Sequence, residues 1–243
     1  MNLKKIIFES LMLFSGIFLA LLLENYIDDN ELREQQEKLL GELILDLDET
    51  IADIENDVQN NGVNLEQNKK MISVVNLSLD VQKSEEALEG AQLICKSSSF
   101  VVPKTSTFES IKSLGLDLIE NNALRTSITA FYELTLSRIS TAEKRLADFS
   151  SEQCWPYISS NFDWPDPLQN TERQVGLGSD DTVMEWLDDG RLKAKNLDNL
   201  LEDSSFKFLL HESLIRRSFQ LLHYKRGLLE ARSLREQISE YLT

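Results

Sequence analysis

The segment from Leu40 to Val58, LGELILDLDETIADIENDV, decides the fold class of this chain. Its apolar side chains recur at alternating intervals of four and three residues, which places them on one face of an α-helix. These side chains are Leu40, Ile44, Leu47, Ile51, Ile54 and Val58. We predict a long amphipathic helix that ends near Asn60, because Asn60-Asn61-Gly62 is typical of a helix end.

Further helical patterns flank a central region that holds all four prolines, at positions 103, 156, 165 and 167. Helices can run unbroken through the proline-free stretches, and the apolar periodicity predicts helices over 65–79, 84–96, 108–114, 123–149 and 204–242. Residues 150–181 combine prolines, glycines and large aromatic side chains, so we expect an irregular loop there. The sequence thus predicts an all-α fold, a bundle of long helices with one irregular loop.

A tight corner is predicted between residues 107 and 122. Thr107 is a suitable N-cap for the helix 108–114, and Gly115 can adopt the left-handed conformation that ends it. Asn121 and Asn122 can cap the helix that follows. We interpret this corner as a folding element with a buried apolar side, and a ligand or partner site there is the alternative.

An apolar run from Ile6 to Leu23 lies near the amino terminus, after Lys4 and Lys5 and before Glu24. Eighteen helical residues cover roughly 27 Å, close to the hydrocarbon thickness of a bilayer. Because no small-residue cleavage motif follows the run, we expect a retained transmembrane helix and not a cleaved signal peptide. Lysines mark the cytoplasmic flank of such a helix. The sequence predicts a single-pass membrane protein with a cytoplasmic N-terminus, an anchor at 1–27 and a helical extracytoplasmic domain at 28–243.

The predicted anchor has one face that could bind another helix. Glu9, Gly16 and Ala20 share a helical stripe, since each residue advances the helix by about 100°. Small residues let membrane helices approach closely, and a polar group on the same face can bond to a partner. The alternative is that Glu9 only reaches the headgroups or pairs with Lys5.

Charge excludes some partners and suggests an internal contact. A net charge of −16 argues against nucleic acid, whose phosphates carry the same sign. From Glu24 to Asp57 there are 13 acidic and two basic residues, whereas Phe206 to Thr243 holds seven basic and four acidic residues. We therefore predict that the first and last helices pack side by side, with apolar contacts providing most of the stability.

Two further features are candidates for structure or binding. Cys95 and Cys154 are the only cysteines, and a disulfide and a pair of buried free thiols are both compatible with the sequence. The segment from 154 to 167 concentrates aromatic residues beside prolines. This loop is either a recognition surface or a lid that buries its rings. The aromatic residues are Trp155, Tyr157, Phe162 and Trp164.

No pattern in the chain predicts an enzyme, a metal site or a cofactor site. His211 and His223 are twelve residues apart, so they do not converge on one helix face as metal ligands would. Gly176-x-Gly178 lacks the strand and the third glycine of a dinucleotide loop. The acidic stretch from Glu42 to Asp57 lacks the spacing of a calcium loop. We expect no catalytic residues, no metal and no cofactor.

The order of features resembles an uncharacterised bacterial family of single-pass membrane proteins, a domain of unknown function. The resemblance lies in the anchor ESLMLFSGIFLAL from Glu9 to Leu21 with Asn25-Tyr26 after it, in TFESIKSLGLDLIENNALR from Thr107 to Arg125, and in the last turns from Glu236 to Leu242. The resemblance implies a helical extramembrane domain held in the bacterial inner (cytoplasmic) membrane. It implies no activity, because the family has none assigned.

These patterns together predict a membrane-anchored interaction or scaffold protein of the bacterial envelope. The lipid bilayer is one expected partner, and a protein partner or a second copy of the chain is the other. The alternative function is a ligand-sensing helical ectodomain that acts through a membrane partner. Short cytoplasmic flanks argue against independent signalling, because only about five residues precede the span.

Overall fold

The computed structural model describes residues 3–77, 91–96, 100–163 and 192–243, without the side chains of residues 3–11, 13, 25, 28, 29 and 92. Its helices are α1 (Leu3–Leu77), α3 (Gln92–Cys95), α4 (Ser106–Leu114), η1 (Leu116–Leu118), α5 (Asn122–Thr129), α6 (Leu136–Phe149), α7 (Trp155–Asn161), α9 (Leu197–Glu202) and α10 (Ser204–Leu242). Two π-helical turns, η2 (Ala130–Thr135) and η3 (Ser150–Cys154), join α5, α6 and α7 into one helical arm. The short strands β1 (Phe162–Asp163) and β2 (Lys193–Ala194) pair antiparallel. The prediction of an all-α fold is confirmed.

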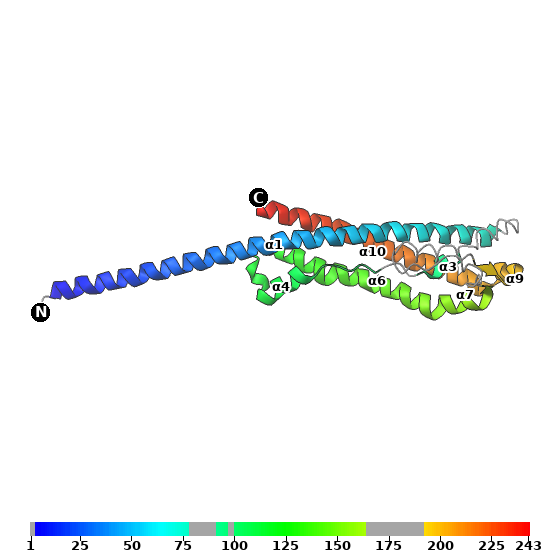
Figure 1. Ribbon diagram of the computed structural model, residues 1–243, viewed down its shortest axis with the longest axis horizontal. Coiled ribbons are helices and arrows are strands. Elements are labelled where there is room, and N and C mark those ends of the chain that lie inside the picture. Colours follow the sequence, from blue (N-terminus) through cyan, green and yellow to red (C-terminus); the bar gives the residue numbers. More distant parts are fainter. Residues whose placement is uncertain (1–2, 78–90, 97–99, 164–191) are drawn as a thin grey trace, which may run out of the picture.

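Three long helical segments lie side by side in the bundle: α1, the arm from α5 to α7, and α10 (Figure 1). The most extensive helix contact joins α1 to α10. The N-terminal part of α1 projects beyond the other helices, at the end of the bundle where the C-terminus and α4 lie (Figure 1). Helices α3, α7 and α9 lie toward the opposite end, which we call the distal end.

The predicted end of the first helix near residue 60 is wrong, because α1 continues without a break through residue 77. Two buried asparagines of this region bond to α10. Asn61 Nδ2 donates to the main-chain carbonyl of Arg217 at 3.3 Å. Asn68 Nδ2 donates to the carbonyl of Leu210 at 3.1 Å, in the amide orientation that suits its neighbours. Two amide side chains that favour a helix end thus bond to α10 from inside a continuous helix, and the predicted helix 65–79 is part of α1 as far as residue 77.

The buried faces of α1 and α10 both alternate spacings of four and three residues. The predicted seam of α1 is correct at Leu40, Leu47 and Ile54, whereas its other three positions are half-buried and lie beside the true seam. The buried positions of α1 that follow this spacing are Gln36, Leu40, Leu43, Leu47, Thr50, Ile54, Asp57, Asn61, Asn64, Asn68, Met71 and Val75, and Leu65 and Val74 are buried beside them. Those of α10 include Phe206, Leu210, Ser213, Arg217, Gln220, Tyr224, Gly227, Ala231, Leu234 and Ile238.

A layer of polar side chains divides the core of the bundle. One apolar cluster surrounds Leu47 and Leu234, and a second surrounds Met71 and Phe206 at the distal end. Between them lies a set of buried polar residues that we call the polar layer. Its members are Asp57, Asn61, Asn68, Glu143, Ser150, Ser213, Arg217 and Gln220. Because buried polar groups need specific partners, this layer fixes the register of the three helical segments.

The predicted contact between the first and last helices is confirmed. Two ion pairs join them: Arg235 Nε lies 2.5 Å from Asp48 Oδ1, and Arg232 pairs with Glu55. Both pairs are exposed, so each contributes only about 0–1 kcal/mol. The buried seams of α1 and α10 therefore supply most of the stability.

The predicted corner forms, but its first helix is capped in an unexpected way. Helix α4 begins at Ser106, and its N-cap residue Thr105 makes no side-chain cap bond. Asp46 of α1 instead accepts a hydrogen bond from the main-chain N–H of Thr107, with Oδ2 at 3.2 Å. Gly115 ends α4 with a φ of +110°, a positive value that favours glycine. The cap predicted within the corner is thus supplied by another helix.

The helical arm from α5 to α7 is longer than predicted. Its start is confirmed, since Asn121 Oδ1 accepts from the N–H groups of Ala123 and Leu124 at 3.0 and 3.1 Å. Irregular structure is predicted from residue 150, and this prediction is wrong for residues 150–161, which η3 and α7 occupy. Pro156 lies in the first turn of α7, directly after the π-helical turn, where a missing N–H costs little. The remainder of the predicted loop, residues 164–181, lies outside the described residues.

Two helical glycines provide a test of the packing. A Cβ atom added at Gly227 of α10 would lie 2.6 Å from Ile139 Cδ1, whereas one added at Gly62 of α1 meets nothing within 4 Å. Gly62→Ala should raise the free energy of unfolding by about 0.5–1 kcal/mol, because alanine favours a helix. Gly227→Ala should lower it by about 1–3 kcal/mol, because Ile139 must shift in a packed core. Urea unfolding of the detergent-solubilised chain measures both, and equal effects would contradict this packing.

The predicted anchor belongs to the projecting part of α1. Its first residues, 6–11, have side chains outside the described set, whereas the apolar side chains from Phe14 to Leu23 are exposed. Within the side chains that the structure does describe, no helix carries an apolar stretch long enough to cross a bilayer.

Candidate functional site

Helix α10 carries a second row of apolar side chains, on the face turned away from its buried seam. Phe208, Ile215, Leu222 and Leu229 recur every seven residues, and Phe219 lies on the same face. Their exposed fractions lie between 49% and 68%. We call these five residues the outer stripe. Large exposed apolar rows are uncommon on soluble surfaces and mark sites of interaction.

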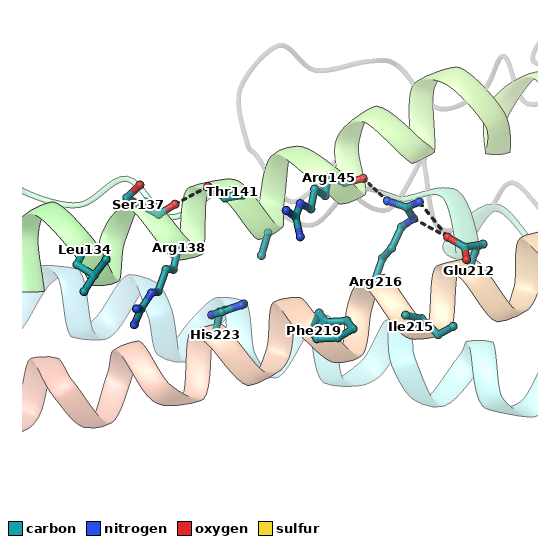
Figure 2. Close-up of a pocket in the computed structure, with 11 residues that line it drawn as sticks. Leu134, Ser137, Arg138, Thr141, Arg145, Glu212, Ile215, Arg216, Phe219 and His223 are labelled. Carbon is teal, nitrogen blue, oxygen red and sulfur yellow. Dashed lines mark hydrogen bonds and ion pairs between the residues drawn. The ribbon is translucent and has the colours of Figure 1, made fainter.

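An open groove of about 440 Å³ lies between α10 and the helical arm, and two residues of the outer stripe, Ile215 and Phe219, line it (Figure 2). Apolar side chains from both helices face the groove, and Arg138 and Arg145 of α6 point toward α10 across it (Figure 2). The residues that line it are Leu134, Ser137, Arg138, Thr141, Ala142, Arg145, Glu212, Ile215, Arg216, Phe219 and His223. The groove therefore combines an apolar surface with cationic side chains.

Arg216 is held in place at one end of the groove. Its Nε and Nη2 atoms lie 3.0 and 2.9 Å from Glu212 Oε2, and its Nη1 donates to the main-chain carbonyl of Arg145 at 3.3 Å. The guanidinium also lies 5.2 Å from the centre of the Phe149 ring. Its positive charge is thus matched by a carboxylate within the groove.

Arg138 and Arg145 differ from Arg216 in having no such partner. Both are exposed, and their guanidinium groups make no hydrogen bond or ion pair with any residue that the structure describes. Arg138 interacts electrostatically with the carboxylate of Glu230. That carboxylate already forms an ion pair with Arg226, with Nε and Oε1 2.8 Å apart. Arg138 and Arg145 therefore add positive charge to this groove on a chain of net charge −16.

The aromatic residues predicted to form a recognition loop or a lid are placed at the distal end. Phe162 is buried, with its ring centre 6.1 Å from that of Phe206. Tyr157 is half-buried, stacks on Phe206 at 5.9 Å, and donates from its hydroxyl to Asp203 Oδ2 at 2.5 Å. Burial, aided by Asp203, raises the pKa of Tyr157. Phe162 and Tyr157 are thus packing residues, Trp155 lies half-buried in α7, and Trp164 lies outside the described residues.

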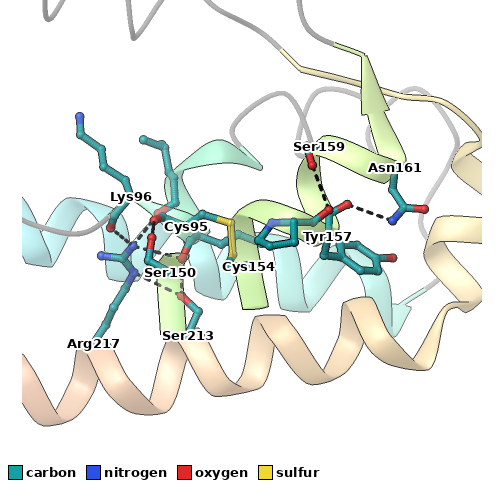
Figure 3. Close-up of a disulfide and its surroundings, with 12 residues drawn as sticks. Cys95, Lys96, Ser150, Cys154, Tyr157, Ser159, Asn161, Ser213 and Arg217 are labelled. Carbon is teal, nitrogen blue, oxygen red and sulfur yellow. Dashed lines mark hydrogen bonds between the residues drawn. A yellow bond between two sulfur atoms is a disulfide. The ribbon is translucent and has the colours of Figure 1, made fainter. Parts of the chain in front are cut away.

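The structure joins Cys95 and Cys154 in a disulfide, with Cα atoms 5.4 Å apart (Figure 3). Both residues are fully buried in the distal apolar cluster. The bond ties α3 to the end of η3, and Ser150 Oγ also donates to the main-chain carbonyl of Cys95. Of the two states compatible with the sequence, the bonded one is present.

Arg217 of the polar layer reaches the same short helix (Figure 3). Its side chain is fully buried, and Nη2 donates to the main-chain carbonyls of Leu93 at 2.7 Å, Ile94 at 3.2 Å and Lys96. Burial lowers the pKa of Arg217 to about 10, so the group stays charged at neutral pH. Carbonyl groups at the C-terminus of a helix carry partial negative charge. Arg217 of α10 thus caps α3.

The predicted anchor face lies in the projecting part of α1. Gly16 and Ala20 are exposed, and a Cβ atom added at Gly16 would meet nothing within 4 Å. The side chain of Glu9 lies outside the described residues. The association of this face with a partner helix stays a prediction.

Glu143 is a buried carboxyl group in the polar layer. Its Oε1 accepts from the main-chain N–H of Val101 at 2.9 Å and from the hydroxyl of Tyr224 at 2.8 Å. Burial raises the pKa of Glu143 above its ordinary value, because desolvation disfavours the carboxylate more than these bonds favour it. The folded protein therefore holds this proton to higher pH than the unfolded chain does.

Glu143→Gln should change how stability depends on pH. A raised folded-state pKa stabilises the fold fully below the unfolded pKa of about 4.3, and the contribution is lost as the pH rises through the folded pKa. The amide retains the acceptor oxygen and stays neutral, so we expect the variant to match the parent near pH 4 and to melt a few degrees higher at pH 8. Thermal unfolding at both pH values measures this. Glu152→Gln, at an exposed position on the same arm, serves as the control, and an equal rise there would contradict the role of burial.

Within the described residues, no group of three His, Cys, Asp or Glu side chains could hold a metal ion. The sequence prediction missed the groove, because it gave one helix over 204–242 and did not separate the outer stripe from the buried seam. The exact repeat of seven from Phe208 to Leu229, distinct from the seam that includes Leu234, was the signal that could have separated them.

No protein-family model, no curated protein and no solved structure matches this chain. The resemblance to an uncharacterised family of single-pass membrane proteins therefore stays a prediction.

Proposed function

We propose that this chain is a membrane-anchored interaction protein of the bacterial envelope, and that the groove between α6 and α10 is its docking surface for another protein. The observation that carries the proposal is the outer stripe, five large apolar side chains that are at least 49% exposed along one helix. Two of them, Ile215 and Phe219, line the groove itself. Exposed apolar area of this kind is stabilised by a partner that removes it from water.

The anchor and the disulfide support the location in this proposal. The apolar run from Ile6 to Leu23 follows two lysines, as in a helix whose N-terminus is cytoplasmic. The helical domain then lies outside the cytoplasm, where a bond between Cys95 and Cys154 persists. Oligomerisation through Glu9, Gly16 and Ala20 would add a second contact within the membrane.

Site-specific photo-crosslinking of the full-length protein in its native membrane tests the docking surface. A photoreactive residue at Phe219 in the groove should form an adduct with another protein, whereas one at the exposed Ser233 of α10 should not. Absence of adducts at Phe219 and at Ile215 would contradict the proposal. A rise in melting temperature with a small molecule, without adducts, would favour a ligand-sensing ectodomain.

Topology has its own test. A C-terminal reporter that is active only outside the cytoplasm should be active when fused after Thr243. Activity of a cytoplasm-specific reporter at the same position would contradict the assigned orientation.

A further inference from the structure

Resting on the docking function proposed above, we infer that the groove binds an amphipathic helix of a different protein, whose apolar stripe is flanked by acidic residues. The chemistry of this partner follows from the shape, the charge and the symmetry of the groove.

The shape of the groove fits a helix. Its walls are two helices, α6 and α10, that run alongside each other (Figure 2). On α10 the lining residues run from Glu212 to His223, which corresponds to about 17 Å of helix at 1.5 Å per residue. Ile215 and Phe219 are the members of the outer stripe that face the groove. A repeat of seven residues matches the spacing at which a second helix presents its own apolar side chains. A partner helix in this position would turn the three-segment bundle into a four-helix bundle.

The charge of the groove selects acidic flanks. Arg138 and Arg145 lie seven residues apart on α6, so they occupy the same face about 10 Å apart along the helix. They have no ion-pair partner among the described residues. Carboxylates seven residues apart on a docked helix would meet both guanidinium groups, and such charged flanks determine which helices pair.

The symmetry of the groove argues against a second copy of the chain. Two copies anchored in one membrane stand parallel, and a parallel pair would bring the groove of one copy, with Arg138 and Arg145, against the same cationic groove of the other. An antiparallel pair would separate these like charges, but the projecting ends of α1 would then point in opposite directions (Figure 1). Like-charge contacts disfavour the first arrangement, and a shared membrane excludes the second.

Two synthetic helical peptides test the chemistry of the partner. Both have 21 residues with leucines at the same positions along one face, and the flanking positions are glutamate in one peptide and lysine in the other. Fluorescence anisotropy with the detergent-solubilised full-length protein should show the glutamate peptide binding at least about tenfold more tightly than the lysine peptide. A tenfold ratio of Kd values corresponds to a difference of about 1.4 kcal/mol in binding free energy. The preference should weaken as salt is added.

Charge reversal provides the decisive comparison. The double variant Arg138→Glu with Arg145→Glu should reverse the preference, so that the lysine peptide binds more tightly. Lys144→Glu, at an exposed position on α6 that does not line the groove, should leave the preference unchanged. Phe219→Asp should abolish binding of both peptides, with unchanged helicity showing that the variant folds.

The outcomes separate this inference from the proposed function. Equal binding of both peptides, or no reversal in the double variant, would overturn the acidic partner. Adducts at Phe219 without peptide binding would overturn it too, while leaving the docking function intact. A wild-type dimer in sedimentation that Phe219→Asp converts to a monomer would show that the occupant is a second copy. Absence of both adducts and peptide binding would overturn the docking function itself.

Discussion

Arg217→Ala is expected to lower the free energy of unfolding by about 3–5 kcal/mol. The wild-type guanidinium is fully buried and donates to three main-chain carbonyl groups around α3. Alanine removes these donors and leaves both a cavity and carbonyl oxygens without partners, and each unsatisfied buried acceptor costs about 1–3 kcal/mol. The side chain also joins α10 to α3. Chemical denaturation of the full-length protein in detergent, followed by circular dichroism, measures the change.

The neighbouring arginine is a matched control. Arg216 differs from Arg217 mainly in burial, since its side chain is 31% exposed and its acidic partner is Glu212. Arg216→Ala should therefore cost less than about 1 kcal/mol, as expected for a partly exposed ion pair. A cost for Arg217→Ala no greater than that for Arg216→Ala would contradict the capping role of Arg217.

Loss of the disulfide is expected to have a similarly large effect. Cys95 and Cys154 are 59 residues apart, and closing a loop of that length restricts the unfolded chain by about 4 kcal/mol in the chain-entropy treatment. The double variant Cys95→Ala with Cys154→Ala should therefore unfold at a much lower denaturant concentration. Reduction of the wild-type protein should reproduce the shift.

The control for this prediction is the cysteine-free variant itself, whose stability should not change when a reductant is added. An unchanged wild-type midpoint after complete reduction would contradict the contribution of the bond. The disulfide and Arg217 also hold the same short helix, α3, from two sides. The combined variant should therefore lose less than the sum of the two separate losses, because the changes share one structural unit.

Much of the fold could be predicted from local patterns. The long C-terminal helix begins at Ser204 as predicted, and Asp203 caps it by accepting from the N–H of Ser205 at 2.7 Å. The positive φ of Gly115 and the cap at Asn121 were also readable, because they depend on residues close in sequence. Charge correctly predicted the contact of α1 with α10, since opposite net charges on two long helices favour their packing.

Other features could not be predicted because the deciding partner lies far away in sequence. The local sequence around Asn61 predicts a helix end, whereas the hydrogen bond from its side chain to the main-chain carbonyl of Arg217 depends on α10. The local sequence predicts Thr107 as an N-cap, but the side chain that accepts a main-chain hydrogen bond at the start of α4 belongs to Asp46 of α1. The proline and aromatic content of residues 150–161 predicts a loop. These residues are helical instead, and their rings and the disulfide pack into the distal apolar cluster.

The sequence by itself determined the helical fold class, the long first and last helices and the apolar N-terminal run, because periodicity, caps and charge act within a few residues. Only the tertiary structure decided which apolar face of α10 is buried, which asparagines of α1 face the bundle interior and which main-chain carbonyl groups Arg217 contacts. It also decided that Phe219 and its neighbours stay exposed beside two unpaired arginines. A helix with apolar residues on two faces carries no local signal of which face meets its own bundle, since that depends on the volume and polar partners of the other helices.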